Sequence, residues 1–212
     1  MTQYGFYFDS SRCTGCKTCS MACKDYKDLP AEIALRKVYD YEGGTWTAGE
    51  GGVYTTDTFA YHVSQGCNHC EKPACVANCP QGAIEKDNKT GLVSINDEKC
   101  IGAGTCVEAC PYGVPVLNDE AKKGLKCDGC AERVAAGMEP ICVEACPVRA
   151  LEFGDIEELR AAHKDAVSGI APMPGPDETK PSIAIKTCPA AKDPGDATGM
   201  VVNVKEVAGE PA

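Results

Sequence analysis

Short stretches of alternating apolar and polar residues are the clearest pattern along this chain. Three of them lie at residues 4–8, 59–63 and 92–95, and each leads into a segment rich in cysteine. A period of two residues is typical of a β-strand. We therefore predict three short strands that each deliver the chain to a cysteine-rich loop.

A second set of apolar runs follows the cysteines. After the last cysteine of three segments the chain reads CPQGAIE, CPYGVPV and CPVRALEF. Proline cannot continue a helix because it lacks a backbone N–H group, and the residues before it, CVANC and CVEAC, are long enough for one helical turn. The chain thus repeats a unit of strand, loop, helical turn and strand.

Two regions depart from this repeat. Residues 24–60 are acidic and rich in glycine, and they predict an insertion. Beyond residue 153, Asp155 and Glu158 have the spacing of a capping box, which predicts a helix over DIEELRAAHKDAV. A Pro/Gly-rich linker, a strand candidate SIAIK and a polar tail follow. A tail with so few apolar residues cannot fold alone, so we expect it to wrap the domain or to lie on a partner.

Composition and charge exclude several classes of protein. The 212 residues include 16 cysteines, which is typical of a cysteine-organised scaffold, and the net charge is −10 without any Lys/Arg cluster. Nucleic acid is therefore not an expected partner. No run of 18 apolar residues predicts a membrane span, and MTQYGFYFDS does not resemble a secretory signal. No Ser/His/Asp set or Cys/His pair indicates a catalytic site, so we do not expect an enzyme.

The cysteines form four groups and leave one residue alone. The groups are Cys13, Cys16, Cys19 and Cys23; Cys67, Cys70, Cys75 and Cys79; Cys100, Cys106 and Cys110; and Cys127, Cys130, Cys142 and Cys146, with Cys188 apart from them. Disulfides would favour cysteines scattered so as to close long loops. Zinc favours two CxxC pairs separated by a loop, and only the fourth group has such a layout.

Iron-sulfur clusters explain the spacing best. In CxxCxxCxxxCP, three thiolates on a tight loop reach three corners of one cubane, while the fourth ligates the cluster of a partner group. Gly15, Gly102 and Gly104 would let the loops turn so that backbone N–H groups point at sulfur.

The third group lacks one expected ligand. Lys99 to Pro111 read KCIGAGTCVEACP, with Ala103 where this motif normally has cysteine. Three thiolates favour a 3Fe-4S cluster of higher potential, which would tune electron entry. Two alternatives stay open: a 4Fe-4S cluster capped at that corner by water, hydroxide or a partner side chain, and an alanine engineered in place of cysteine.

The chain resembles the four-cluster ferredoxin-type iron-sulfur subunits of molybdopterin oxidoreductases, and most closely those of dimethyl sulfoxide reductases. The segments that carry the resemblance are YGFYFDSSRCTGCKTC, FAYHVSQGCNHCEKPAC, KCDGCAERVAAGMEPICVEACPVRALEFG and TKPSIAIK. The resemblance implies an α+β fold of tandem, nested bacterial ferredoxin-like modules, with an insertion and an extended C-terminal tail. It pairs residues 1–23 with 124–155 in one module and assigns 61–123 to the other, with 24–60 as the insertion and 156–212 as a helix and partner-wrapping tail.

The resemblance also implies a ligand set for each cluster. Site 1 would be Cys13, Cys16, Cys19 and Cys146; site 2 would be Cys127, Cys130, Cys142 and Cys23; site 3 would be Cys67, Cys70, Cys75 and Cys110; and site 4 would be Cys79, Cys100 and Cys106. We therefore expect three 4Fe-4S clusters and one 3Fe-4S cluster, or a 4Fe-4S cluster with a non-cysteine ligand.

The function implied is electron relay between two partners. These are a membrane anchor subunit that oxidises quinol and a catalytic subunit that holds molybdopterin. The expected location is peripheral to the inner membrane, on the extracytoplasmic side by co-export with the catalytic subunit, with the cytoplasm as the alternative. Two other functions stay open: a free-standing polyferredoxin, and the electron-transfer subunit of another molybdopterin enzyme such as a formate dehydrogenase.

Five residues outside the ligand sets invite an interpretation. His69 is expected to be a loop residue near a cluster, and Cys188 an unligated thiol, with rescue of site 4 as the less favoured reading. Lys126 and Arg149 are either cations that raise a cluster's potential or solvated charges. Trp46 is expected to pack rather than to conduct electrons.

Overall fold

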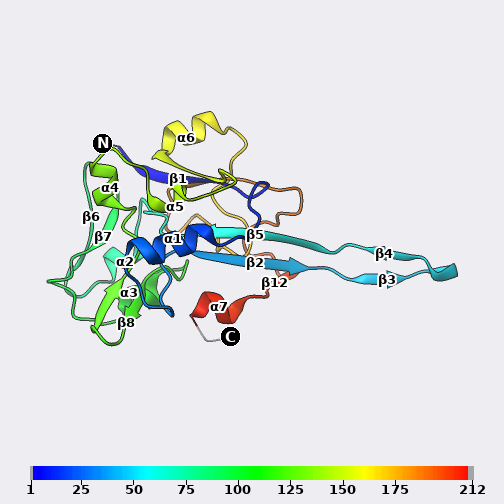
Figure 1. Ribbon diagram of the computed structural model, residues 1–212, viewed down its shortest axis with the longest axis horizontal. Coiled ribbons are helices and arrows are strands. Elements are labelled where there is room, and N and C mark those ends of the chain that lie inside the picture. The colour runs from blue at the N-terminus through cyan, green and yellow to red at the C-terminus, as the bar shows by residue number, and fades with distance from the viewer. Residues whose placement is uncertain (1, 210–212) are drawn as a thin grey trace.

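The strands and helices are short, as the many turn residues require. The computed structural model describes residues 2–209 and mixes strands with helices in an α+β arrangement (Figure 1). The strands are β1 (Tyr4–Asp9), β2 (Lys37–Gly43), β3 (Trp46–Ala48), β4 (Tyr54–Thr56), β5 (Phe59–Gln65), β6 (Ile84–Lys86), β7 (Val93–Ile95), β8 (Val116–Asn118), β9 (Lys123–Leu125), β10 (Leu151–Asp155), β11 (Ile183–Lys186) and β12 (Gly199–Val201). The helices are α1 (Thr18–Tyr26), the 3₁₀ turn η1 (Glu50–Gly52), α2 (Ala74–Ala77), α3 (Thr105–Ala109), α4 (Ala131–Ala135), α5 (Ile141–Glu144), α6 (Ile156–Ala162) and α7 (Val204–Ala208).

The strand β1 is buried on both faces. It pairs antiparallel with β10 and parallel with β11. Phe6 and Phe8 face the main core, while Tyr7 packs with Ile156 and Leu159 of α6 on the other face. The predicted strand at residues 4–8 is therefore confirmed, but helix α6 covers the face that simple alternation leaves to solvent.

The predicted strands and helical turns around the cysteines are present. The strands β5 and β7 precede the second and third groups, and β6, β8 and β10 follow the Cys-Pro pairs. The turns α2, α3 and α5 stand at CVANC and the two CVEAC segments. The repeat of strand, loop, turn and strand is confirmed at these positions.

Helix α6 is shorter than predicted. Asp155 caps it, because its carboxylate accepts hydrogen bonds from the backbone N–H groups of Glu157 and Glu158 at 2.9 and 3.3 Å. The helix ends at Ala162 rather than continuing to residue 167. His163 leaves the helical conformation, stacking on Tyr7 with ring centroids 3.6 Å apart. This contact with β1 outweighs the helical propensity of the following residues.

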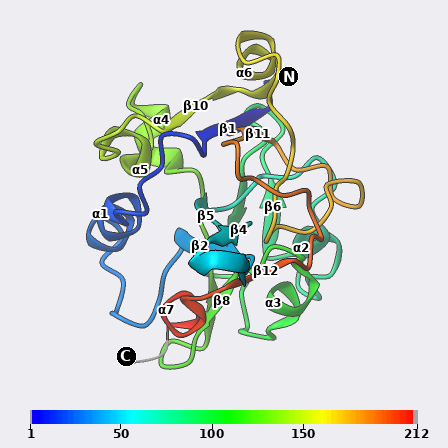
Figure 2. The same cartoon turned by 90° about the vertical axis from the view of Figure 1, so that its right-hand side faces the viewer.

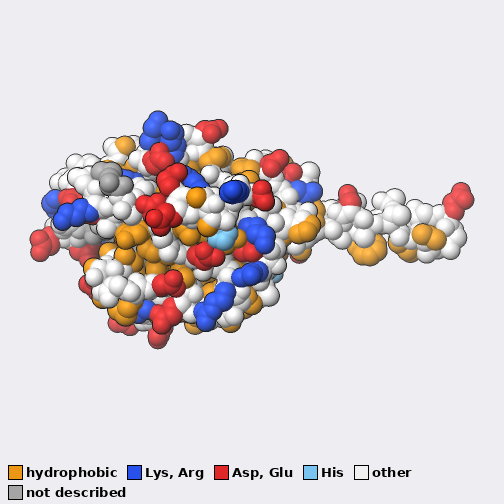
Figure 3. Space-filling model, turned by 90° about the horizontal axis from the view of Figure 1, so that it is seen from above, with side chains coloured by type: hydrophobic (Ala, Val, Ile, Leu, Met, Phe, Trp, Pro, Cys, Tyr) orange, Lys and Arg blue, Asp and Glu red, His pale blue; other side chains and the backbone are white. Residues whose placement is uncertain are grey.

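The strands β2 and β5 form a long ribbon that projects from the body of the molecule. They pair from Lys37 opposite Gln65 to Gly43 opposite Phe59, and β3 and β4 continue the same hairpin outward (Figures 1 and 3). We call residues 44–58 the arm. Trp46, at 67% exposure, lies on the arm and not in a core, so the expectation that it packs is wrong within this chain. The cause is that the arm has no other element of residues 2–209 to pack against.

The tail of the chain lies on the chain's own sheets. The strand β11 pairs with β1, and β12 pairs with β2. Asn203 then fixes the start of α7, since its side-chain carbonyl accepts from the N–H of Asp40 and its amide donates to the carbonyl of Val38, at 2.9 and 2.8 Å. Within residues 2–209, no helix has both the length and the apolarity that crossing a bilayer would need.

The elements around the cysteines divide into two halves. Helix α1 contacts α5, and α2 contacts α3. Figure 2, which looks along the arm, shows α1, α4 and α5 on one side of the ribbon and α2 and α3 on the other. The first and fourth cysteine groups therefore lie together, as do the second and third.

Candidate iron-sulfur centres

All sixteen cysteines are free thiols. Two cavities with the same empty volume, about 340 Å³, are lined by cysteine sets. One contains the four thiols of site 3, and the other contains the three thiols of site 4 together with Ala103. Within residues 2–209, no three Cys, His, Asp or Glu side chains converge tightly enough to hold a single metal ion. The thiols stand around spaces larger than one ion.

The remaining grouped thiols gather in two further places. Burial raises the pKa of the Cys13 thiol to about 11, and the neighbouring thiols of Cys19, Cys146 and Cys16 add to the rise. Burial likewise raises the pKa of Cys23, with contributions from Cys127, Cys142 and Cys130. Thiols crowded in this way resist ionisation until a cation binds them, as ligation to iron requires.

Helical turns connect the sites in pairs. Helix α1 carries Cys19 among the thiols of site 1 and Cys23 among those of site 2. Four residues along a helix correspond to about 6 Å, so adjacent sites receive thiols one turn apart. Around α2, Cys75 lines the cavity of site 3 and Cys79 that of site 4 in the same way.

The loops that carry the thiols share one backbone conformation. The residue two places after the first cysteine of each group has a positive φ: 66° at Gly15, 42° at His69, 70° at Gly102 and 71° at Gly129. Glycine adopts this region without steric cost, and His69 adopts it despite having a side chain. The loop at Ala103 therefore keeps the conformation of the loops that have all their cysteines.

Backbone N–H groups point at the sulfur atoms. The residue four places after a cysteine donates to it twice, from Ala83 to Cys79 at 3.2 Å and from Ala150 to Cys146 at 3.3 Å. Although burial opposes it, the N–H groups of residues 81–84 lower the pKa of the Cys79 thiol. Such donors stabilise negative charge on sulfur.

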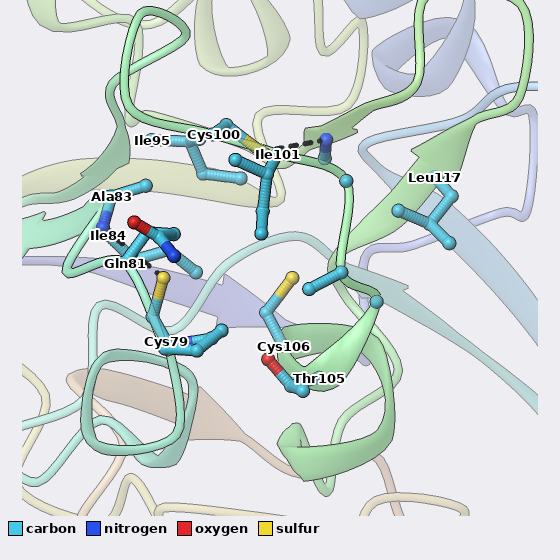
Figure 4. A pocket seen from close by; sticks show the side chains of 15 residues that line it. Cys79, Gln81, Ala83, Ile84, Ile95, Cys100, Ile101, Thr105, Cys106 and Leu117 are labelled. Carbon is cyan, nitrogen blue, oxygen red and sulfur yellow. Dashed lines mark hydrogen bonds between the residues drawn. The ribbon is translucent and has the colours of Figure 1, made fainter.

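The site 4 cavity is apolar apart from its thiols. Figure 4 shows the sulfur atoms of Cys79 and Cys106 turned towards the space between them. Most of the other lining side chains are aliphatic, and among the described lining residues only Gln81 and Thr105 carry side-chain oxygen. Gly102 is required here because a Cβ atom would lie 2.4 Å from the Lys122 carbonyl oxygen.

Relatives of known function share these features. A family model described as a 4Fe-4S dicluster domain matches residues 58–156. The chain is 52% identical over 206 residues to the iron-sulfur subunit of the anaerobic dimethyl sulfoxide reductase of Escherichia coli (strain K12), covering 97% of this chain and 99% of that subunit. The chain belongs to the family of dimethyl sulfoxide reductase iron-sulfur subunits.

Two further relatives agree with this placement. The corresponding subunit of the Haemophilus influenzae dimethyl sulfoxide reductase is 49% identical over 98% of this chain and 100% of its own length. The formate dehydrogenase iron-sulfur subunit of the same species is 32% identical over 76% of this chain and 54% of its own length. The family predicted from the cysteine motifs is confirmed. The protein is an iron-sulfur electron-transfer subunit and is not the catalytic one.

In this member of the family, His69 and Lys126 lie between the two halves. His69 is fully buried in the loop of the second cysteine group, and its Nδ1 accepts from the N–H of Val93 at 2.9 Å. Its hydrogen must therefore be on Nε2. Burial lowers the pKa of its imidazole, while the neighbouring thiol of Cys127, from the fourth group, opposes that shift. His69 thus contacts the other half of the molecule as well as its own loop.

The other residues singled out in the sequence differ in their surroundings. Lys126 is buried, lines the site 3 cavity and donates to the carbonyl of Cys127 at 2.6 Å. Arg149 is exposed and donates to the carbonyls of Glu144 and Cys146 at the end of α5. Cys188 lies beside Ser10, whose hydroxyl accepts from its N–H at 2.7 Å, and it is not among the residues that line site 4. The reading of Cys188 as a rescue ligand therefore has no support.

Sequence reasoning missed Arg36. This residue precedes β2, inside the region interpreted as an insertion, and it is only 3% exposed. No spacing rule connects an arginine at this position with the cysteines, so the sequence carries no signal for its role.

Proposed function

We propose that this chain relays electrons through four iron-sulfur clusters between a quinol-oxidising membrane anchor and a molybdopterin-containing catalytic subunit. The observation that carries the proposal is that consecutive thiol sets share a helical turn or a loop, so that the sets form one row. The proposed clusters are of the 4Fe-4S type at sites 1, 2 and 3 and of the 3Fe-4S type at site 4. When bound, they supply one-electron redox chemistry.

The order of the row follows from the shared elements. Helix α1 joins site 1 to site 2 through Cys19 and Cys23, and the turn α2 joins site 3 to site 4. His69, in the site 3 loop, lies beside Cys127 of site 2. These contacts support the order 1, 2, 3, 4. They also support two nested ferredoxin-like modules, one from the first and fourth cysteine groups and one from the second and third.

Site 4 is the proposed point of electron entry from the quinol side. Its cavity has the same empty volume as that of site 3, so the missing thiolate has not collapsed it. Three thiolates suit a 3Fe-4S cluster, and the aliphatic lining limits the side chains that could ligate a fourth iron. We infer that Ala103 tunes this step without removing the site.

Site 1 is the proposed point of electron exit. Cys16 is exposed. The site 1 loop lies against the β2–β5 ribbon, since a Cβ on Gly15 would lie 2.6 Å from the His62 ring and Lys17 pairs with Asp40 at 3.4 Å. The same ribbon continues into the arm, where Trp46, Val53 and Tyr54 are exposed. We propose that the catalytic subunit binds the arm and covers site 1.

The proposed location follows from the partners. A subunit held by a membrane anchor and exported with its catalytic partner would lie on the extracytoplasmic side of the inner membrane. The alternatives predicted from the sequence, a cytoplasmic location, a free-standing polyferredoxin and a formate dehydrogenase subunit, are distinguished by what co-purifies with the chain and from which fraction.

The test is metal analysis combined with purification of the native assembly. We expect the chain to elute with a molybdopterin-containing subunit on gel filtration and to carry about 15 irons, from three four-iron clusters and one three-iron cluster. Electron paramagnetic resonance (EPR) of the air-oxidised protein should show a 3Fe-4S signal. Zinc in place of iron, or elution as a lone chain, would contradict the proposal, and about 16 irons without that signal would contradict the assignment of site 4.

A further inference from the structure

Arg36 is a buried cation without a carboxylate partner. Its side chain takes part in none of the ion pairs formed by residues 2–209. Its Nη1 donates to the backbone carbonyl and the hydroxyl of Ser64 at 3.3 and 3.1 Å, its guanidinium lies 4.8 Å from the centroid of the Phe6 ring, and its Nε has no hydrogen-bond partner within the described part of the chain. A buried charge left in this state is costly unless another charge compensates it.

The charges that surround Arg36 are sulfurs of two different sites. Burial disfavours its charged form, but the thiols of Cys142, Cys19, Cys127 and Cys23 together outweigh burial and raise its pKa. Cys19 belongs to the site 1 set, whereas Cys23, Cys127 and Cys142 belong to the site 2 set. Arg36 therefore lies where these two sites meet.

Several contacts hold the guanidinium in this position. The hydroxyl of Ser64 lies 3.1 Å from Nη1 of Arg36 and 3.3 Å from Sγ of Cys19, so it bridges the cation and a proposed ligand. The carbonyl of Arg36 accepts from the hydroxyl of Ser20 on α1 at 2.7 Å. Gly66 leaves room for the side chain, because a Cβ there would lie 3.0 Å from Nη2. The position is built from α1, β5 and the segment before β2.

We propose that Arg36 is an internal counter-ion shared by the clusters of sites 1 and 2, and that it holds the reduction potentials of both upward. The inference rests on the proposed function, because the compensating charge is that of thiolate-ligated clusters. Net charge around a cluster is one of the factors that set its potential. A fixed cation in a site of low dielectric constant stabilises the added electron more than a solvated one does. It thereby keeps both clusters of the exit half reducible by the clusters before them.

The test uses the complete assembly with Arg36→Gln and Arg36→Lys, titrated potentiometrically and followed by EPR. For Arg36→Gln we expect the equilibrium constant for one-electron reduction to fall about tenfold at two of the four clusters, a shift of about 59 mV to lower potential. Arg36→Lys keeps the charge and should retain most of the potential. The site 4 signal, from the other half of the chain, should not move in either variant.

The matched control is Arg160→Gln. Arg160 is on α6, where it pairs with Glu157, and no cysteine neighbours it among its contacts. This variant also removes one positive charge from the chain, so it corrects for the change in net charge. We expect no shift in any cluster.

Each result decides the matter. Unchanged potentials in Arg36→Gln with full iron content would overturn the inference and leave the proposed function intact. If Arg36→Gln fails to assemble two clusters, recovery of both in Arg36→Lys supports the counter-ion role, and failure in Arg36→Lys shows that shape rather than charge is needed and overturns it. Wild-type protein without iron would instead contradict the proposed function itself.

Discussion

At the scale of single residues, Ala103 is the position where this chain departs from the ligand pattern of its other cysteine groups. Its loop keeps the conformation of the others, with Gly102 and Gly104 at φ of 70° and 77°. The backbone thus remains able to present a thiolate although none is there. The departure concerns the ligand and not the loop.

Restoring the cysteine should therefore restore a fourth iron. In Ala103→Cys we expect iron to rise by about one per chain and the 3Fe-4S signal to be replaced by that of a reducible 4Fe-4S cluster, since a fourth thiolate holds the corner iron. Metal analysis and EPR measure both. Ala77→Cys is the matched control, because Ala77 is exposed on α2 and outside the cavity. An unchanged signal in Ala103→Cys would contradict a vacant corner at site 4.

Gly102→Ala should remove this site. The positive φ alone costs about 1–2 kcal/mol in a residue with a Cβ, and at Gly102 the Cβ would also lie 2.4 Å from the Lys122 carbonyl oxygen. Gly113→Ala is the control, since its φ of 59° is similar but nothing lies within 4 Å of the added atom. We expect loss of the site 4 signal in Gly102→Ala only. Equal loss in both variants would show that backbone strain, and not the clash, is responsible.

At the scale of elements, the arm is an extended hairpin without a tertiary partner in the described part of this chain. The three-residue strands β3 and β4 are fully exposed, and the arm joins the body only through β2 and β5. Two strands without a packed face are marginally stable in water. A hairpin of this kind gains stability when a partner covers it.

Polar substitution of the arm should weaken binding of the catalytic subunit without affecting the clusters. We expect the triple variant Trp46→Ser, Val53→Ser, Tyr54→Ser to keep its full iron content and to lose co-elution with the catalytic subunit, because exposed aromatic and aliphatic side chains dominate the energy of interfaces. Met200→Ser is the control, since Met200 is equally exposed at 67% but lies on β12. Co-elution that survives the triple variant would assign the interface to another surface.

At the scale of the whole molecule, cysteines make up much of the buried material. The main core unites Cys19, Cys23, Cys67, Cys127, Cys142 and Cys146 with the aromatic and aliphatic residues around them. A core of this kind relies on what its thiols bind. Folding and cluster binding should therefore be coupled.

Removing iron should then unfold the chain rather than leave a folded apoprotein. On incubation with a chelator and an oxidant we expect the cooperative thermal transition to be lost together with the visible absorbance of the clusters. Circular dichroism and absorbance followed in the same sample measure this coupling. A chain that keeps its transition after losing all iron would show that side-chain packing alone stabilises the fold.

The sequence by itself determined the local units and the family. Alternating residues predicted β1, β5 and β7, and Cys-Pro pairs predicted where the helical turns end, because these patterns depend on backbone geometry over a few residues. The spacing of the cysteines indicated iron-sulfur chemistry for the same reason, since neighbouring thiolates must reach corners of one cluster.

Only the tertiary structure decided the contacts between distant segments. It placed Arg36 between sites 1 and 2 and His69 beside Cys127, ended α6 at His163 through a stack on Tyr7, and left Trp46 exposed on the arm. None of these follows from local periodicity, because each depends on which surface another part of the chain brings near. Burial and charge compensation are properties of the assembled fold, and they are where this protein's redox tuning is to be sought.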